Sequence, residues 1–167
     1  MTHRSARSYL ANSFLWLVPV MVWNSALTDQ LPRPFQADVF WNNISPFLAY
    51  GENSSRMAVF ALALFTPFHL STRVQKTGLC LYLVGLLVYF AAWLVLIRFP
   101  ESSWSTGLAG FTAPSYTPAV WLAGIGLMGD SFYGKLPFSR WYFFGCALIF
   151  LLFHIFHASI IFYRLHS

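Results

Sequence analysis

The segment from Gly78 to Ile97 constrains this chain more than any other feature, because its 20 residues include no charged side chain. A helix of this length is about 30 Å long, which is the thickness of the hydrocarbon core of a bilayer. An uncharged run of this length is far longer than a strand or a short core helix of a soluble protein requires. The segment therefore predicts a membrane-spanning helix.

The composition of the whole chain points the same way. Of its 167 residues, 57% are hydrophobic, 20% are aromatic and only 9% are charged, whereas soluble domains carry about 25% charged residues. The formal net charge is +5, but the lysines and arginines stand singly between apolar runs and form no patch with aromatic platforms. This pattern argues against a nucleic-acid partner and predicts that the lipid bilayer is the main partner.

Four further apolar runs lie at residues 9–27, 56–72, 116–133 and 141–163. Together with the central run they predict an all-α fold, a polytopic membrane helix bundle in which residues 1–167 form a single domain with about five transmembrane helices. The fourth run contains Gly124, Gly126 and Gly129. Small residues let neighbouring backbones approach closely, so we expect this helix at the centre of the packing.

An aromatic-rich segment, residues 28–55, separates the first two runs. Pro32, Pro34 and Pro46 predict that it holds no long helix, and Asn53, with the two serines that follow it, is expected to cap a helix that begins at Arg56. The segment nevertheless carries many large apolar residues, among them Phe35, Val39, Phe40, Trp41, Phe47, Leu48 and Tyr50, which a freely solvated loop would not need. We expect it to be amphipathic and to lie on the membrane surface or cap the bundle.

The distribution of basic residues predicts the orientation. With five spans and a cytoplasmic N-terminus, six basic residues fall on the cytoplasmic side and four on the outer side. The cytoplasmic group is Arg4, Arg7, Arg73, Lys76, Lys135 and Arg140, and the outer group is Arg33, Arg56, Arg98 and Arg164. The positive-inside rule thus favours a bacterial inner membrane protein with its C-terminus outside.

His154 and His157 are three residues apart, so on a helix they share one face. Two interpretations stay open: a metal, haem or proton site, or two neutral imidazoles that hydrogen-bond to neighbouring helices. A closed metal site needs three or four ligands, and no cysteine or carboxylate lies within a turn of the pair, so the pair by itself predicts no metal. Cys80 and Cys146 each lie inside an apolar run and are expected to be reduced thiols.

The predicted topology brings several polar residues to the outer end of the bundle. Glu52, Arg56 and His157 are the candidate catalytic or proton-transfer residues, and Asn24, Asn53 and His154 are the candidate ligand-binding residues. Such a cluster could bind a polar head group while aromatic walls hold an apolar tail. The alternative is a plain Glu52–Arg56 pair four residues apart on a helix, with His157 facing lipid or a partner subunit.

His69 and Asp130 are predicted near the cytoplasmic ends of their helices. Acidic residues inside membranes often mark transport pathways, but Asp130 could equally reach water or pair with Lys135.

Three functions follow from these residues. The first is a protein that binds or processes a lipid-like or other small apolar molecule in an outer-side polar pocket. The second is an accessory or structural subunit of a larger membrane complex, and the third is a small oligomeric transporter that uses Asp130. The chain contains no catalytic or phosphate-binding sequence motif, so the sequence leaves both enzymatic activity and the cofactor open.

Overall fold

The computed structural model describes residues 12–133 and 137–166, in which every regular element is a helix. The first part contains the 3-10 helices η1 (Ser13–Trp16), η2 (Thr28–Gln30) and η3 (Arg33–Phe35) and the α-helices α2 (Val18–Leu27) and α3 (Ala37–Phe40). The remainder contains α4 (Pro46–Phe65), α5 (Arg73–Arg98), α6 (Leu108–Phe111), α7 (Ala113–Tyr116), α8 (Pro118–Met128) and α9 (Arg140–His166). The prediction of an all-α fold is confirmed for these residues.

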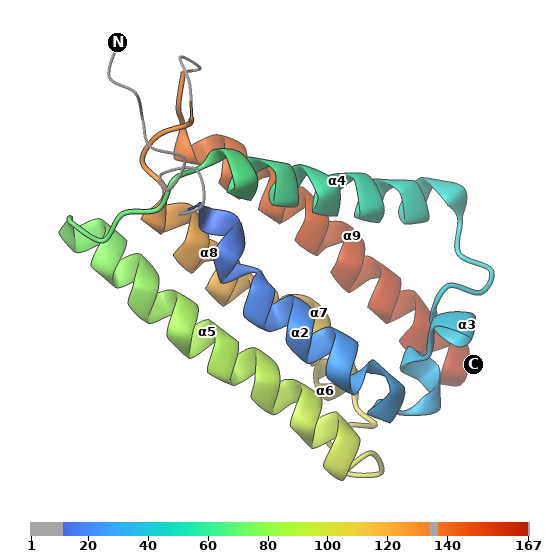
Figure 1. The fold of residues 1–167 in the computed structure, drawn as a ribbon. Coiled ribbons are helices and arrows are strands. Elements are labelled where there is room, and N and C mark those ends of the chain that lie inside the picture. The colour runs from blue at the N-terminus through green and yellow to red at the C-terminus, as the bar shows by residue number, and fades with distance from the viewer. Residues whose placement is uncertain (1–11, 134–136, 167) are drawn as a thin grey trace.

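The long helices form two closely packed pairs, α5 with α8 and α4 with α9, and α8 also contacts α9. Helix α2 lies across the space between the two pairs (Figure 1). Large side chains attach it to α5: the rings of Trp23 and Phe90 stack with centroids 4.0 Å apart, and the Tyr82 hydroxyl donates to the carbonyl oxygen of Trp16, just before α2, at 2.8 Å. The core lies where α2, α5, α8 and α9 meet.

The α5–α8 pair is close because glycine removes side chains from the contact. A Cβ atom on Gly124 would lie 2.5 Å from the backbone nitrogen of Tyr82 and 2.6 Å from the carbonyl oxygen of Gly78, so only glycine fits there. On the other side of α8, a Cβ on Gly126 would lie 2.8 Å from the Phe144 ring of α9. Helix α8 is therefore central to the packing, as its glycines predicted.

Two helices of the described residues, α5 and α9, are long and apolar enough to cross a membrane, with 26 and 27 residues. They contain the predicted runs 78–97 and 141–163. The structure thus supports a membrane location through these two helices, whereas a bundle of five spans is not established. Cys80 and Cys146 are both free, as expected.

The predicted start of the second helix is wrong, because α4 begins at Pro46 and not at Arg56. The Ser45 hydroxyl accepts a hydrogen bond from the Leu48 amide at 3.3 Å, and Pro46 occupies the first turn, where its missing N–H has no intrahelical acceptor to lose. Residues 46–55 are therefore helical and not part of a loop, and Asn53 is no N-cap. Glu52 consequently lies inside the helix, one turn before Arg56.

Proline also ends this second predicted helix early and divides the fourth. Helix α4 ends at Phe65, and Thr66, which precedes Pro67, is extended, so residues 66–72 do not continue it. The predicted helix 116–133 is divided between α7 and α8, and α8 ends before the extended Gly129.

The first predicted helix, 9–27, is not one continuous helix, because its described part is divided into η1 and α2, and Pro19 lies in the first turn of α2. Residues 9–11 lie outside the described residues. So do Arg4, Arg7 and Lys135, on which the predicted orientation partly depends.

Candidate functional site

Glu52 is the centre of a buried polar cluster formed by Glu52, Arg56, His154 and His157. Its side chain is fully buried, and Oε1 accepts hydrogen bonds from the Arg56 guanidinium and from His154 Nδ1, the latter at 3.0 Å. Oε2 lies 2.7 Å from His157 Nδ1. The contact between Glu52 and His157 that the topology predicted is therefore present, and it joins α4 to α9.

His157 is held on both sides of its ring. While Nδ1 faces Glu52, Nε2 lies 2.8 Å from the carbonyl oxygen of Phe40, and the rings of Phe40 and Trp41 pack against the imidazole with centroids 4.2 Å and 4.6 Å away. The end of α3 thus covers this side chain, which is fully buried. Part of the aromatic-rich segment therefore caps the polar cluster.

His154 and Arg56 lie on the other side of Glu52, next to Phe150. The His154 imidazole stacks on the Phe150 ring with centroids 5.3 Å apart and planes 15° apart. The Arg56 guanidinium carbon lies 5.4 Å from the centroid of the same ring, within the range of a cation–π contact. Phe150 therefore helps to fix both side chains in position.

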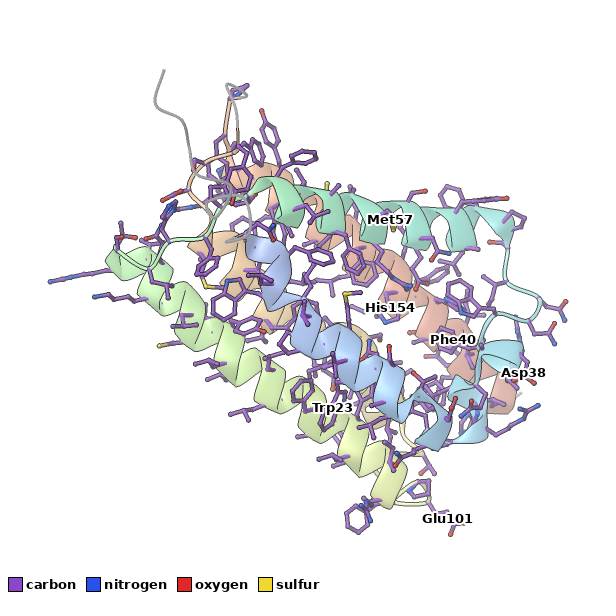
Figure 2. All side chains as sticks on the ribbon, in the orientation of Figure 1. Trp23, Asp38, Phe40, Met57, Glu101 and His154 are labelled. Carbon is purple, nitrogen blue, oxygen red and sulfur yellow. The ribbon has the colours of Figure 1, made fainter. Side chains whose placement is uncertain are left out.

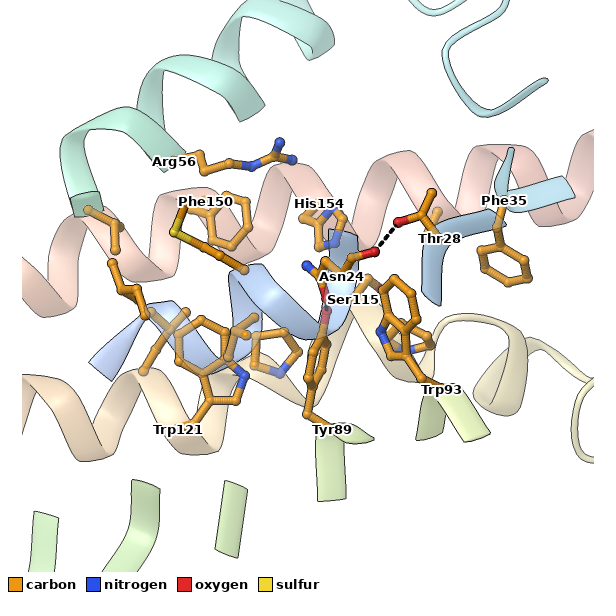
Figure 3. Close-up of a pocket in the computed structure, with 18 of the residues that line it drawn as sticks. Asn24, Thr28, Phe35, Arg56, Tyr89, Trp93, Ser115, Trp121, Phe150 and His154 are labelled. Atoms are coloured by element: carbon orange, nitrogen blue, oxygen red, sulfur yellow. Dashed lines mark hydrogen bonds between the residues drawn. The ribbon is translucent and has the colours of Figure 1, made fainter. Parts of the chain in front are cut away.

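A cavity of about 430 Å³ lies beside the cluster, bounded by α2, α4, α5, α7, α8 and α9. Most of its lining is aliphatic or aromatic, and it includes Trp93, Trp121 and Phe150. Its polar lining residues are Asn24, Ser25, Thr28, Arg56, Tyr89, Ser115 and His154. Figure 3 shows Arg56 and His154 on one side of this space and Trp121, Tyr89 and Trp93 on the other, with Asn24 between them. Arg56 and His154 therefore connect the buried cluster to the cavity.

Asn24 contributes to the cavity as the sequence predicted, through a partner that the sequence did not reveal. The Tyr89 hydroxyl donates to Asn24 Oδ1 at 2.7 Å, and the Thr28 hydroxyl donates to the Asn24 carbonyl oxygen at 2.5 Å (Figure 3). Tyr89 is nearly fully buried, so this hydrogen bond fixes the Asn24 side chain at the cavity wall.

The other predicted polar residues lie elsewhere. Asn53 is exposed and donates from Nδ2 to the Ala49 carbonyl oxygen at 2.9 Å, so it does not join the pocket. The reason is that adjacent helical residues point about 100° apart, which turns Asn53 away when Glu52 points inward.

His69 and Asp130 form a separate group. His69 Nδ1 lies 3.4 Å from Asp130 Oδ1, and Gln75 Nε2 donates to Asp130 Oδ2 at 2.8 Å. Neither His69 nor Asp130 lines the cavity. Lys135, the predicted partner of Asp130, lies outside the described residues.

Sequence reasoning missed three contributors to the site. Tyr89 and Trp121 belong to apolar runs, where a polar role has no sequence signature, and Phe40 acts through its main-chain carbonyl, which every residue carries. Within residues 12–133 and 137–166, no three histidine, cysteine or acidic side chains are arranged to hold a metal ion. Comparisons of the chain with protein-family models, curated proteins and solved structures gave no match.

Proposed function

We propose that this protein binds a small, largely apolar molecule in the cavity between its helices, with the polar end of that molecule at Arg56 and His154. The observation that carries the proposal is the composition of the cavity wall. Apolar and aromatic side chains make up most of it, and the few polar lining residues include Arg56 and His154. This is the usual composition of a small-molecule site, and about 430 Å³ falls within the roughly 300–1,000 Å³ of such sites.

The buried cluster supports this function by fixing the two polar residues that reach the cavity. Arg56 and His154 have flexible or rotatable side chains, and both are bound to the same carboxylate oxygen of Glu52. A ligand therefore meets groups that are already oriented, which lowers the entropy cost of binding.

We further propose that the ligand-binding domain is a five-span bundle in a bacterial inner membrane, with the N-terminus in the cytoplasm. Helices α5 and α9 support a membrane location, and α4 is 20 residues long. Val22 on α2, Leu87 on α5 and Leu152 on α9 are 62%, 70% and 61% exposed. Large apolar side chains that face outward on three helices suit contact with lipid tails. In this arrangement the ligand enters from the bilayer or from its outer surface.

The two alternative functions rest on other parts of the molecule. The transporter hypothesis depends on Asp130, which belongs to the separate group with Gln75. The accessory-subunit hypothesis depends on a docking surface, and Phe47, Tyr50 and Trp141 are 78%, 73% and 77% exposed. Both remain predictions, and neither uses the cavity or the buried carboxylate.

Tryptophan fluorescence tests the proposal directly, because Trp93 and Trp121 line the cavity. The purified full chain in mild detergent is titrated with 10-bromodecanol, whose bromine quenches nearby tryptophans. Ala158 also lines the cavity and is 2% exposed, so Ala158→Leu should fill space that the probe needs. We expect saturable quenching whose affinity falls about tenfold in Ala158→Leu, equivalent to a loss of ~1.4 kcal/mol.

The matched control is Ala61→Leu, the same substitution at an exposed position of α4, which should bind like the unmodified protein. Equal affinities for Ala158→Leu and Ala61→Leu would show that the probe does not enter the cavity, and the proposed function would be abandoned.

A further inference from the structure

The hydrogen bonds of His157 determine the number of protons that it shares with Glu52. His157 Nε2 faces the carbonyl oxygen of Phe40, which can only accept, so Nε2 carries a proton. Nδ1 faces Glu52 Oε2 at 2.7 Å, and two lone pairs at that distance would repel, so one proton lies between these atoms. The pair is either imidazolium with carboxylate or neutral imidazole with carboxylic acid. In both cases its summed charge is zero.

Arg56 then has no full compensating charge. Its guanidinium stays protonated and donates to Glu52 Oε1, but the charge of that carboxyl group is already balanced within the Glu52–His157 pair. His154 donates from Nδ1 to the same oxygen and adds no negative charge. The polar cluster of Glu52, Arg56, His154 and His157 therefore carries a net charge of at least +1.

No other acidic side chain of the described residues supplies the missing negative charge. None of the residues that line the cavity is an aspartate or glutamate. Asp29 is exposed, Asp38 is paired with Arg33, and Asp130 contacts Gln75 and His69. Asp38 and Glu101 project from the outside of the molecule, whereas His154 lies inside it (Figure 2). The excess positive charge thus adjoins a mostly apolar cavity.

We infer that the ligand is an anionic amphiphile, with a carboxylate or phosphate head group on an apolar chain; this inference rests on the proposed function. A charge next to apolar walls is costly unless an opposite charge pairs with it. A guanidinium has five N–H donors in a planar fork that matches carboxylate and phosphate oxygens. Arg56 uses one nitrogen on Glu52 and also lines the cavity.

Two neighbours complete the head-group site. His154 Nε2 has no hydrogen-bond partner within residues 12–133 and 137–166, so it is available to the ligand. Asn24 accepts from Tyr89 through Oδ1, which leaves its amide N–H groups to donate. Arg56, His154 and Asn24 all line the same cavity (Figure 3). The head group binds among these three side chains, and the apolar chain extends toward Trp93 and Trp121.

The test compares three probes with the same brominated ten-carbon chain: 10-bromodecanoate, 10-bromodecyl phosphate and the uncharged 10-bromodecanol. Tryptophan quenching is measured in mild detergent at pH 8 with the unmodified full chain, with Arg56→Gln and with Arg98→Gln. Arg98 is the exposed last residue of α5 and serves as the matched control. We expect at least one anionic probe to bind about tenfold more tightly than the alcohol in the unmodified protein and in Arg98→Gln. Arg56→Gln should lose this difference but retain its affinity for the alcohol.

Preference for the carboxylate would identify a single-chain acid, and preference for the phosphate would identify a lipid phosphate head group; either result supports the inference. Equal binding of all three probes to the unmodified protein would overturn it and leave the proposed function intact. Failure of all three probes to bind would overturn both. If Arg56→Gln does not fold, Arg56→Lys takes its place. Because Lys keeps the charge but lacks the fork, this variant should still prefer the anion, by a smaller factor.

Discussion

The two main helix pairs of this protein are held together in opposite ways. Between α5 and α8, side chains are removed: Gly78 and Gly124 let backbone atoms meet. Between α4 and α9, polar side chains are added: the carboxylate of Glu52 bonds to His154 and His157. The α5–α8 interface depends on the close fit of the two helix backbones, whereas the α4–α9 interface depends on hydrogen bonds between specific polar side chains.

This difference between the two interfaces explains the position of the cavity. Backbone contact leaves no room between α5 and α8. The α4–α9 pair presents Arg56 and His154 toward the remaining space, and α2 closes that space with large side chains. The α5–α8 side of the cavity is thus mostly apolar, whereas the α4–α9 side adds Arg56 and His154 to its apolar residues, which suits an amphiphilic ligand. Substitutions in each interface test this difference.

Glu52→Leu should have the largest effect, because it leaves Arg56 and His157 without their shared acceptor. Removing one partner of a buried ion pair costs roughly 3–5 kcal/mol, so the free energy of unfolding should fall by about that amount. Unfolding in mixed micelles with increasing dodecyl sulfate, followed by circular dichroism, measures it. Glu101→Leu, at an exposed position, is the control and should change little. If Glu52→Leu and Glu101→Leu both changed the free energy of unfolding only slightly, the polar α4–α9 interface would not stabilise the fold.

His157→Phe should come next. The ring keeps its apolar contacts with Phe40 and Trp41, but Glu52 and the Phe40 carbonyl each lose a hydrogen bond. Buried polar groups left unsatisfied cost about 1–3 kcal/mol each. Because Glu52 keeps its bonds to Arg56 and His154, we expect a loss of roughly 2–4 kcal/mol in the same assay. His154→Phe removes one bond from a partly exposed ring and should cost less. A larger loss of stability in His154→Phe than in His157→Phe would mean that His154, and not His157, provides the main contact between α9 and Glu52.

Gly124→Ala tests the other interface. Its Cβ would meet the backbone of Tyr82 and Gly78, which cannot move without separating α5 from α8, and overpacking of this kind costs roughly 1–3 kcal/mol. Gly145 offers a matched control on α9, because a Cβ there has no atom within 4 Å. Gly145→Ala should be neutral or stabilise by up to about 1 kcal/mol, since Ala favours helix. Destabilisation of the same size in both would contradict a backbone contact at Gly124.

Asp38→Asn should have the smallest effect and sharpens the contrast between buried and exposed charge. Arg33 and Asp38 form two hydrogen bonds, at 3.1 Å and 2.6 Å, but their side chains are 72% and 63% exposed. Exposed ion pairs contribute about 0–1 kcal/mol. We therefore expect a barely measurable change in the free energy of unfolding, far smaller than that caused by Glu52→Leu. If Asp38→Asn lowered the free energy of unfolding as much as Glu52→Leu, the expected difference between exposed and buried charges would be wrong.

The sequence predicted the residues of the polar cluster better than the shape of the site. Glu52 and His157 could be brought together because charge distribution sets the direction of each helix, and spacing sets which residues share its face. Asn53 was misplaced because the start of α4 was put ten residues too late. Pro46 was interpreted as a helix breaker, although in the first turn of a helix a proline is favourable.

The cavity itself could not be predicted. It exists because α2 stays at a distance from α4 and α9, and that distance depends on how Trp23, Phe90 and Tyr89 pack, which no local pattern encodes. The end of α7 and the whole of α8 were predicted as one helix, 116–133, for a similar reason. Pro114 lies in the first turn of α7 and Pro118 begins α8, so each proline helps to start a short helix.

The bonds between Glu52 and α9 also have a consequence for biosynthesis. Glu52 precedes His154 by 102 residues and His157 by 105, and chains elongate at about 5–20 residues per second. The carboxylate is therefore made several seconds before its histidine partners, during which the ribosome still holds the C-terminal part. Arg56, four residues away on the same helix, is available almost at once. In the newborn protein the arginine is thus the first partner of the carboxylate, and the two histidines join it there once α9 has been made.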